Sequence, residues 1–338
     1  MLIYLQYLRG FAALMVVYFH ISIQGNSLSM DNIILPEFGE LGVDLFFVLS
    51  GFIMVYITEQ KNVTAVTFLK ERFLRIAPLY WLLTLLASTV ALILPELLKS
   101  TEFNLAHFFL SLTFIPAIHP IFNQQVWPVV IPGWTLNYEM YFYLLFSLSL
   151  LCSKQSKVIT LTVLMTCVFI LVRYFYTEAL AFTWFYGDLI VYEFIFGGMI
   201  GVLINKGIYF QRPVISFTIV ITSVVMFLAL PQTDLSRLFH FGIPAALLIY
   251  GLVSLNLIWP IYINQWLKLL GDSSYSLYLS HVFVITFVRV LLSKLLPNDS
   301  ELLVPLFIIL SFSLSLAVAV FTYAYIEKPL GRWSKRFL

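Results

Sequence analysis

Runs of about twenty apolar residues recur along the whole chain, separated by short polar segments. An α-helix of this length crosses the hydrocarbon core of a bilayer with all its backbone polar groups bonded internally. The composition agrees, because 61% of the residues are hydrophobic, 11% are charged and the mean hydropathy is +0.95. The alternation typical of a membrane β-barrel is absent. The sequence therefore predicts an all-α integral membrane protein.

The apolar runs predict a bundle of about ten transmembrane helices. We expect one membrane domain over residues 1–338, with no fused soluble domain. The first run is expected to be a helix of the mature protein, because no basic segment of a signal peptide precedes it. The expected helices span residues 3–24, 41–58, 75–95, 132–151, 157–176, 186–205, 213–231, 239–258, 273–296 and 301–326.

The positions of lysine and arginine predict the topology, since cytoplasmic loops of membrane proteins collect positive residues. If the N-terminus is cytoplasmic, the opposite face keeps only Lys99, Arg173, Arg237 and Lys294. Both termini are then cytoplasmic, as an even number of helices requires. The cytoplasmic segments would hold Lys61, Lys70, Arg72, Arg75, Lys154, Lys157, Lys206, Arg212, Lys268, Lys328, Arg332, Lys335 and Arg336.

The first expected helix carries two ionisable residues, Arg9 and His20. Their eleven-residue separation is about three helical turns, so they share one face and lie about 16 Å apart along the axis. Ionisable side chains at membrane depth are expensive, and they normally face a protein interior or a wet cavity. A single intramembrane histidine can also be a packing residue, but a second charge on its face favours a functional site.

Glu139 lies about 10 Å below the outer end of the fourth expected helix, at a depth comparable to that of His20. A histidine oriented by a carboxylate is suited to act as the general base for an alcohol. We therefore consider His20 and Glu139 candidate catalytic residues. The alternative for Glu139 is a structural partner of an arginine or tyrosine. Asp44 and Glu193 also fall in outer halves, where they could be interface or helix-end residues.

On the cytoplasmic side, Arg72 and Arg75 precede an apolar run and lie three residues apart on one helix face. They could be positive membrane anchors, or they could clamp phosphate groups with their forked donors. Asp272 or Ser273 is the candidate N-cap of the ninth helix, and the N-terminus of a helix attracts anions. Serines also allow close helix packing in membranes.

Several other classes of site lack support in the sequence. Cys152 and Cys167 are fifteen residues apart, which predicts packing residues rather than a disulfide framework. No basic and aromatic pattern predicts nucleic-acid binding. No metal site is predicted, because ligand spacing is absent among the five histidines, His20, His107, His119, His240 and His281.

Six segments, in order along the chain, resemble the acyltransferase 3 family of bacterial ten-helix membrane proteins. The first is the Arg-x10-His pattern of Arg9 and His20. The second and third are "GVDLFFVLSGFIM" from Gly42 and "RFLRIAPLYW" from Arg72. The others are "WTLNYEMYFY" from Trp134, "SYSLYLSH" ending at His281, and "IEKPLGR" with Glu327. The chain is most similar to the short O-acetyltransferases of exopolysaccharide and of the O-antigen of lipopolysaccharide.

This resemblance implies an enzyme of the bacterial inner membrane that O-acetylates a glycan. The donor would be cytoplasmic acetyl-CoA, and the acceptor a hydroxyl of a lipid-linked or polymeric glycan. Arg9 and His20 would be essential, and Arg72 and Arg75 would lie on the donor side, with Ser273 a further candidate there. Direct attack on the thioester and a transient acyl-histidine both remain open.

Two functions of other classes compete with this one. In a proton-coupled transporter, the same intramembrane Arg, His and Glu residues would relay protons across the bilayer. The absence of an internal repeat weakly disfavours that class. As a scaffold subunit of a polysaccharide export machine, the chain would not need His20.

Overall fold

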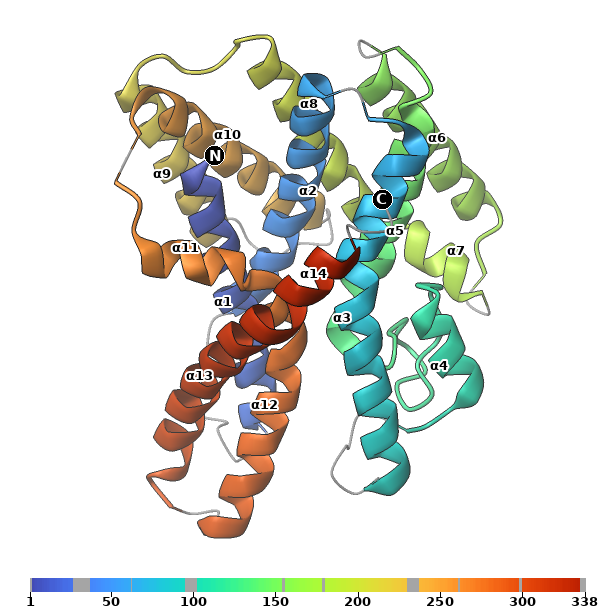
Figure 1. The fold of residues 1–338 in the computed structure, drawn as a ribbon, viewed down its shortest axis with the longest axis vertical. Coiled ribbons are helices and arrows are strands. Elements are labelled where there is room, and N and C mark those ends of the chain that lie inside the picture. Colours follow the sequence, from blue (N-terminus) through green and yellow to red (C-terminus); the bar gives the residue numbers. More distant parts are fainter. Residues whose placement is uncertain are drawn as a thin grey trace.

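A computed structural model describes residues 2–26, 37–61, 63–94, 102–153, 156–177, 180–229, 237–260, 262–297 and 300–334, and these are almost entirely helical (Figure 1). The only extended pairing in these ranges is an isolated bridge between Ile118 and Val126. The all-α prediction is therefore confirmed. Four of the basic residues used to predict the topology lie outside the described ranges: Lys99, Lys154, Lys335 and Arg336.

Each of the ten expected ranges contains a helix. Seven helical segments of the described chain are long and apolar enough to cross a membrane. Leu189–Asn205 and Pro213–Ala229 are apolar but shorter, and α5 has 16 residues, so ten crossings and cytoplasmic termini remain predictions. The matching helices are α1 (Ile3–Asn26), α2 (Leu41–Gln60), α3 (Ala65–Ile93), α5 (Trp134–Ser149), α6 (Lys157–Tyr174), α8 (Glu193–Asn205), α9 (Pro213–Ala229), α10 (Ile243–Ile258), α12 (Ser274–Leu295) and α13 (Leu303–Thr322).

Helix α3 begins ten residues earlier than expected, at Ala65 rather than at residue 75. The backbone N–H of Thr67 donates to the side chain of Thr64, which caps the helix. The segment that carries Arg72 and Arg75 is too polar to be counted in an apolar run, yet it continues the helix without a break. Both arginines therefore lie on a helix and not in a loop before it.

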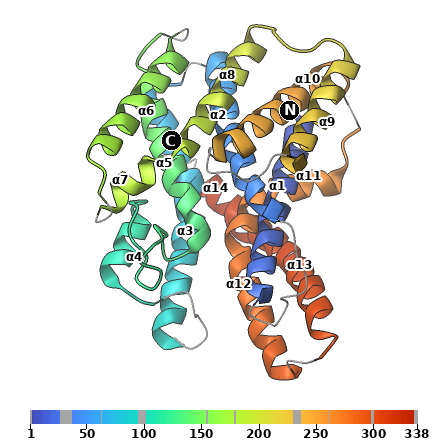
Figure 2. The same ribbon diagram turned by 180° about the vertical axis from the view of Figure 1, so that it is seen from behind.

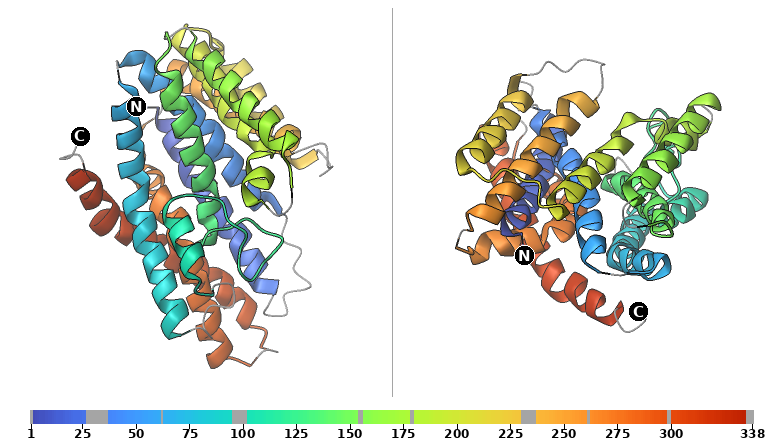
Figure 3. Two further views of the ribbon diagram at one scale, coloured as in Figure 1. Left: turned by 90° about the vertical axis from the view of Figure 1, so that its right-hand side faces the viewer. Right: turned by 90° about the horizontal axis from the view of Figure 1, so that it is seen from above.

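Helix α2 lies between two groups of helices when the molecule is seen from above (Figure 3). It packs on α1 and α10 on one side and on α8 and α5 on the other. In the first group, α1 lies against α12 and α13, and their apolar side chains form one buried cluster. The second group comprises α3 and α5 with α6, α8 and the short α7 (Ala181–Tyr186), and α6 and α7 cover its outer side (Figure 2). Residues of α2 therefore face both groups.

Glycines allow α2 and α8 to approach each other at backbone distance. A Cβ added at Gly51 would collide with the carbonyl oxygen of Phe194, and one added at Gly197 would collide with that of Val48. Small residues at such crossings let membrane helices pack closely. This crossing fixes α2 against the second group.

The segment that precedes α5 folds inward. The short α4 (Leu105–Leu112) packs on α3, and the irregular chain after it leads to a 3-10 turn, Ile131–Gly133, directly before α5. Val129, Val130 and Pro132 are buried. Helix α5 therefore starts beneath this segment and not at the surface. Toward one end of the molecule, α12 and α13 extend on one side and α3 with α4 on the other (Figure 1).

Candidate functional site

Two cavities lie on either side of a wall formed by Val43 of α2 and Tyr278 of α12, which line both of them. The larger has a volume of about 780 Å³ and contains His20. The smaller, of about 250 Å³, contains Arg9, Arg72 and Arg75. We call them the histidine cavity and the arginine cavity. Helix α1 reaches both, because Arg9 and His20 lie on one face, as their spacing predicts.

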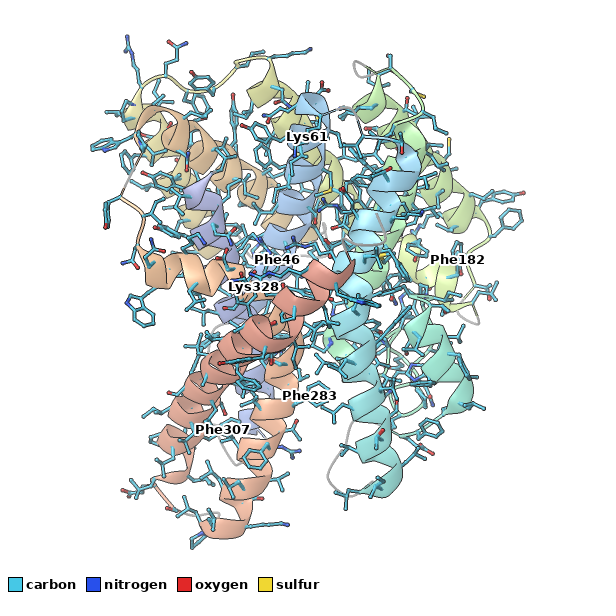
Figure 4. The ribbon with its side chains drawn as sticks, viewed as in Figure 1. Phe46, Lys61, Phe182, Phe283, Phe307 and Lys328 are labelled. Atoms are coloured by element: carbon cyan, nitrogen blue, oxygen red, sulfur yellow. The ribbon has the colours of Figure 1, made fainter. Side chains whose placement is uncertain are left out.

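Nine Phe, Tyr and Trp side chains line the histidine cavity. Phe283, labelled in Figure 4, lines it from α12. The segment between α4 and α5 also lines this cavity, from Phe122 to Ile131. Aromatic faces with a few polar groups are typical of sites for small organic ligands. Its other aromatic members are Phe19, Phe122, Trp127, Trp134, Tyr138, Trp184, Phe185 and Tyr278.

The ring of His20 is held in one tautomer. Its Nδ1 lies 3.0 Å from the carbonyl oxygen of Val16, one turn earlier in α1. A carbonyl oxygen only accepts hydrogen bonds, so Nδ1 carries the proton in the neutral ring. The other nitrogen, Nε2, then has a free lone pair. His20 therefore has the protonation pattern of a general base or a nucleophile.

The ring of His281 of α12 packs edge-on against that of His20, and the two ring centroids are 4.7 Å apart. Its Nδ1 likewise donates to a carbonyl oxygen one turn earlier, that of Leu277, at 3.0 Å. The ring is fully buried, and its Nε2 has no hydrogen-bond partner in the described part of the chain. The sequence shows His281 near the start of this helix but gives no indication that it contacts His20.

The arginine cavity combines positive charge with hydroxyl groups. Arg72 and Arg75, three residues apart on α3, both line it, as does Arg9 from α1. Nη1 of Arg9 donates to Oε1 of Gln6 at 3.4 Å, and Nε of Arg72 is buried without a partner among the described residues. Three guanidinium groups around so small a space form a candidate anion site.

Glu139 lies in the arginine cavity. Its Oε1 accepts hydrogen bonds from Ser50, at 2.8 Å, and from Tyr143. Among the described residues, Glu139 makes no hydrogen bond or ion pair with His20, which it was predicted to orient. The predicted depth of Glu139 is counted from the end of an apolar run, on the assumption that this run begins at the surface. Helix α5 instead begins beneath the buried segment before it. The alternative of a tyrosine partner agrees with the contact to Tyr143.

Ser273 occupies the N-cap position of α12, one of the two predicted, but its hydroxyl caps no backbone N–H of this helix and points back along the chain. The Oγ donates to the carbonyl oxygens of Leu269, at 2.9 Å, and Leu270. The next residue, Ser274, lines the arginine cavity, and its buried Oγ has no partner in the described ranges. The sequence does not distinguish Ser273 from Ser274 as the serine that faces the cavity, since both residues suit the start of a helix.

Asp44 has a structural partner far away in the sequence. Arg237, which lies just before α10, donates from Nε and Nη2 to its two carboxylate oxygens, each at 2.9 Å, and from Nη1 to Glu40 at 2.7 Å. Burial would lower the pKa of Arg237, but Asp44 and Glu40 outweigh it and raise this pKa above its usual value. This guanidinium is charged and fully paired. Glu193 is buried next to the pair.

Comparison with known proteins identifies the family of the chain. Residues 2–324 match the acyltransferase 3 family, described as "Acyltransferase domain". The chain is also similar to the exopolysaccharide production protein ExoZ of Rhizobium meliloti (strain 1021), with 36% identity over 257 residues that cover 74% of this chain and 78% of that protein. No solved structure matches the chain. With this match over nearly its whole length, the chain belongs to the acyltransferase 3 family.

Proposed function

We propose that this protein transfers an acetyl group from cytoplasmic acetyl-CoA to a hydroxyl of a bacterial surface glycan at the inner membrane. The acceptor is an exopolysaccharide or an O-antigen, either lipid-linked or polymeric. Family membership and the similarity to an exopolysaccharide production protein support this function. The observation that carries it is the pair of cavities along one helix, one rich in arginine and one containing a histidine with a free Nε2.

In this proposal the arginine cavity receives the donor. Arg72 and Arg75, with Arg9 deeper on α1, bind the phosphate groups of acetyl-CoA through charge-assisted hydrogen bonds. Ser274, at the start of α12, adds a hydroxyl group to this cavity, and Ser273 beside it holds the turn that leads into the helix. Glu139 balances part of the positive charge. The acyl end of the donor extends past Val43 and Tyr278 toward His20.

The histidine cavity receives the acceptor. Nε2 of His20 takes the proton of a sugar hydroxyl, and the oxygen attacks the carbonyl carbon of the thioester. The carbon–sulfur bond then breaks, the acyl ester remains on the sugar, and the thiolate of CoA takes the proton from His20. A route through an acyl-histidine uses the same nitrogen as the nucleophile. His281, against the His20 ring, holds its orientation.

The test uses the host strain with the gene deleted and restored as wild type, His20→Ala or Arg9→Ala. O-acetyl groups on the isolated surface polysaccharide are measured by NMR, and immunoblots control for normal insertion. We expect acetylation with the wild type, loss in both variants, and an unchanged amount of glycan.

Two results would reject the proposal. If acetylation persists in the deletion strain, another enzyme is responsible for it. If acetylation is unaffected in the variants while glycan export or proton flux changes, the transporter class explains the intramembrane charges better. Acetyl-CoA binding to the purified protein separates the enzyme from both a transporter and a scaffold.

A further inference from the structure

Arg289 of α12 lines the histidine cavity together with Val282, Phe283 and Thr286. Thr286 follows Val282 by four residues and Phe283 by three, and Arg289 follows Thr286 by three, so the four residues lie on one face of the helix. Arg289 follows His281 by eight residues, which places it about 12 Å farther along the axis. The cavity is therefore lined by His20, whose ring contacts His281 of α12, and by Arg289 farther along α12.

The charged residues around this cavity differ in whether they have a partner of opposite charge. Glu40 and Arg237 are paired with each other at 2.7 Å, and Asp188 accepts the backbone N–H of Ile190 at 2.9 Å. Arg289 has neither an ion pair nor a hydrogen bond within the described ranges, and its Nε is buried. Of the two arginines that line the histidine cavity, Arg237 has carboxylate partners and Arg289 has none within the described ranges.

An unpaired guanidinium in an apolar helix has two physical explanations. A long side chain near a helix end can extend to the membrane interface and meet lipid headgroups. Arg289 instead contributes to the cavity wall, next to Thr286, whose hydroxyl accepts a hydrogen bond from Gln24 at 3.3 Å. Its planar fork matches the oxygen pair of a phosphate or a carboxylate.

We propose that Arg289 forms the anion subsite of the acceptor: it binds a phosphate or carboxylate of the glycan while a hydroxyl of the same molecule lies at His20. This inference rests on the proposed function. The anion is either the phosphate that joins the glycan to a lipid carrier or the carboxylate of an acidic sugar. Donor phosphates are assigned to the other cavity, on the far side of Val43 and Tyr278, so the two anion sites serve different substrates.

The test compares wild type, Arg289→Ala and Arg289→Lys in nanodiscs of zwitterionic lipid. Lys294→Ala is the matched control, because Lys294 is an exposed cation in the last turn of the same helix. Three acceptor probes are used: a neutral oligosaccharide, the same oligosaccharide with one glucuronic acid residue, and the neutral oligosaccharide on polyprenyl diphosphate. Both acyl transfer and direct binding of each probe are measured.

We expect Arg289→Ala to weaken the binding of one anionic probe by about tenfold to a hundredfold. The kcat/KM for that probe should fall by about the same factor. The neutral probe and acetyl-CoA should be unaffected, Arg289→Lys should retain part of the preference, and Lys294→Ala should behave as wild type. The glucuronate arm and the diphosphate arm show which anion is bound.

Equal losses for neutral and anionic probes would overturn the subsite, as would a wild type that binds all three probes alike. If the wild type binds an anionic probe through Arg289 but transfers no acyl group to any acceptor, the subsite stands and the proposed acetyl transfer fails. If transfer occurs without any dependence on Arg289, the proposed function stands and the subsite is rejected.

Discussion

The two cavities differ in size and in the way their charges are balanced. The histidine cavity is three times as large, about 780 Å³ against 250 Å³, and nine Phe, Tyr and Trp side chains line it. Its Arg237 is fully paired with Asp44 and Glu40. The arginine cavity has three guanidinium groups and only one carboxylate, Glu139, in its wall. The small cavity suits a strongly anionic ligand, and the large one suits a sugar that needs broad apolar contact.

The two cavities share one wall, so ligands bound in them would lie next to each other. Val43 and Tyr278 line both cavities, and the Tyr278 hydroxyl is anchored by Thr135, at 2.9 Å, and by the carbonyl oxygen of Pro132. Two substrates bound on either side would meet at this wall, close to His20. Substitutions confined to one cavity should therefore affect one substrate and leave the other unchanged.

The largest effect is expected for His20→Ala in the purified protein. Loss of a general base lowers kcat by about 10²–10⁴-fold, while acetyl-CoA binding should be unchanged because it depends on the other cavity. Added imidazole should restore part of the rate, since the substitution leaves space for it. Steady-state kinetics and donor titration measure both effects. A variant that loses donor binding as well would show that the cavities do not act separately.

Arg75→Ala should weaken the donor side alone. Removal of one charge-assisted contact of about 1.5–3 kcal/mol raises the KM for acetyl-CoA by roughly ten- to a hundredfold. Acetyl-pantetheine, which lacks the nucleotide phosphates, should be used equally well by the variant and the wild type. Lys70→Ala is the control, because Lys70 is an exposed cation of the same helix. The same loss with acetyl-pantetheine would contradict phosphate binding by Arg75.

The sequence predicts the helices and much of each cavity through two regularities. The length of the apolar runs locates a helix in each expected range, and the helical period puts Arg9 and His20 on one face and Arg72 and Arg75 on another. Both regularities are local. They act within one helix and need no knowledge of its neighbours.

Contacts between helices could not be predicted in this way. The pairing of His20 with His281 depends on how α1 and α12 cross, and that of Arg237 with Asp44 joins residues 193 positions apart. Glu139 was expected at the depth of His20, but α5 starts beneath a folded segment, and the carboxylate lies in the arginine cavity. A single sequence contains no direct signal for such tertiary placement.

A packing test addresses the crossing of α2 and α8, which holds α2 in place between the two groups of helices. Gly197→Ala should destabilise the protein by about 1–3 kcal/mol, because the added methyl group would collide with the backbone of α2 at Val48. Gly198→Ala is the matched control, since its Cβ would meet Val55 at an ordinary 3.4 Å. Thermal unfolding in detergent should give a lower Tm for the first variant only. Equal Tm values would mean that α2 and α8 do not cross this closely.

The smallest effect is expected for Tyr143→Phe, and it decides to which substrate Glu139 belongs. The Tyr143 hydroxyl donates to Oε1 of Glu139, which would keep only its bond from Ser50. Loss of one such bond costs about 0.5–1.5 kcal/mol and leaves Glu139 less firmly held beside the arginines that bind the donor. The KM for acetyl-CoA should therefore rise by roughly two- to tenfold. If Glu139 acts in the arginine cavity, the KM for the acceptor and the pH dependence of kcat stay as in the wild type. If Glu139 orients His20 instead, the pH profile of kcat shifts while the KM for the donor does not, and the carboxylate must be reassigned to the histidine cavity.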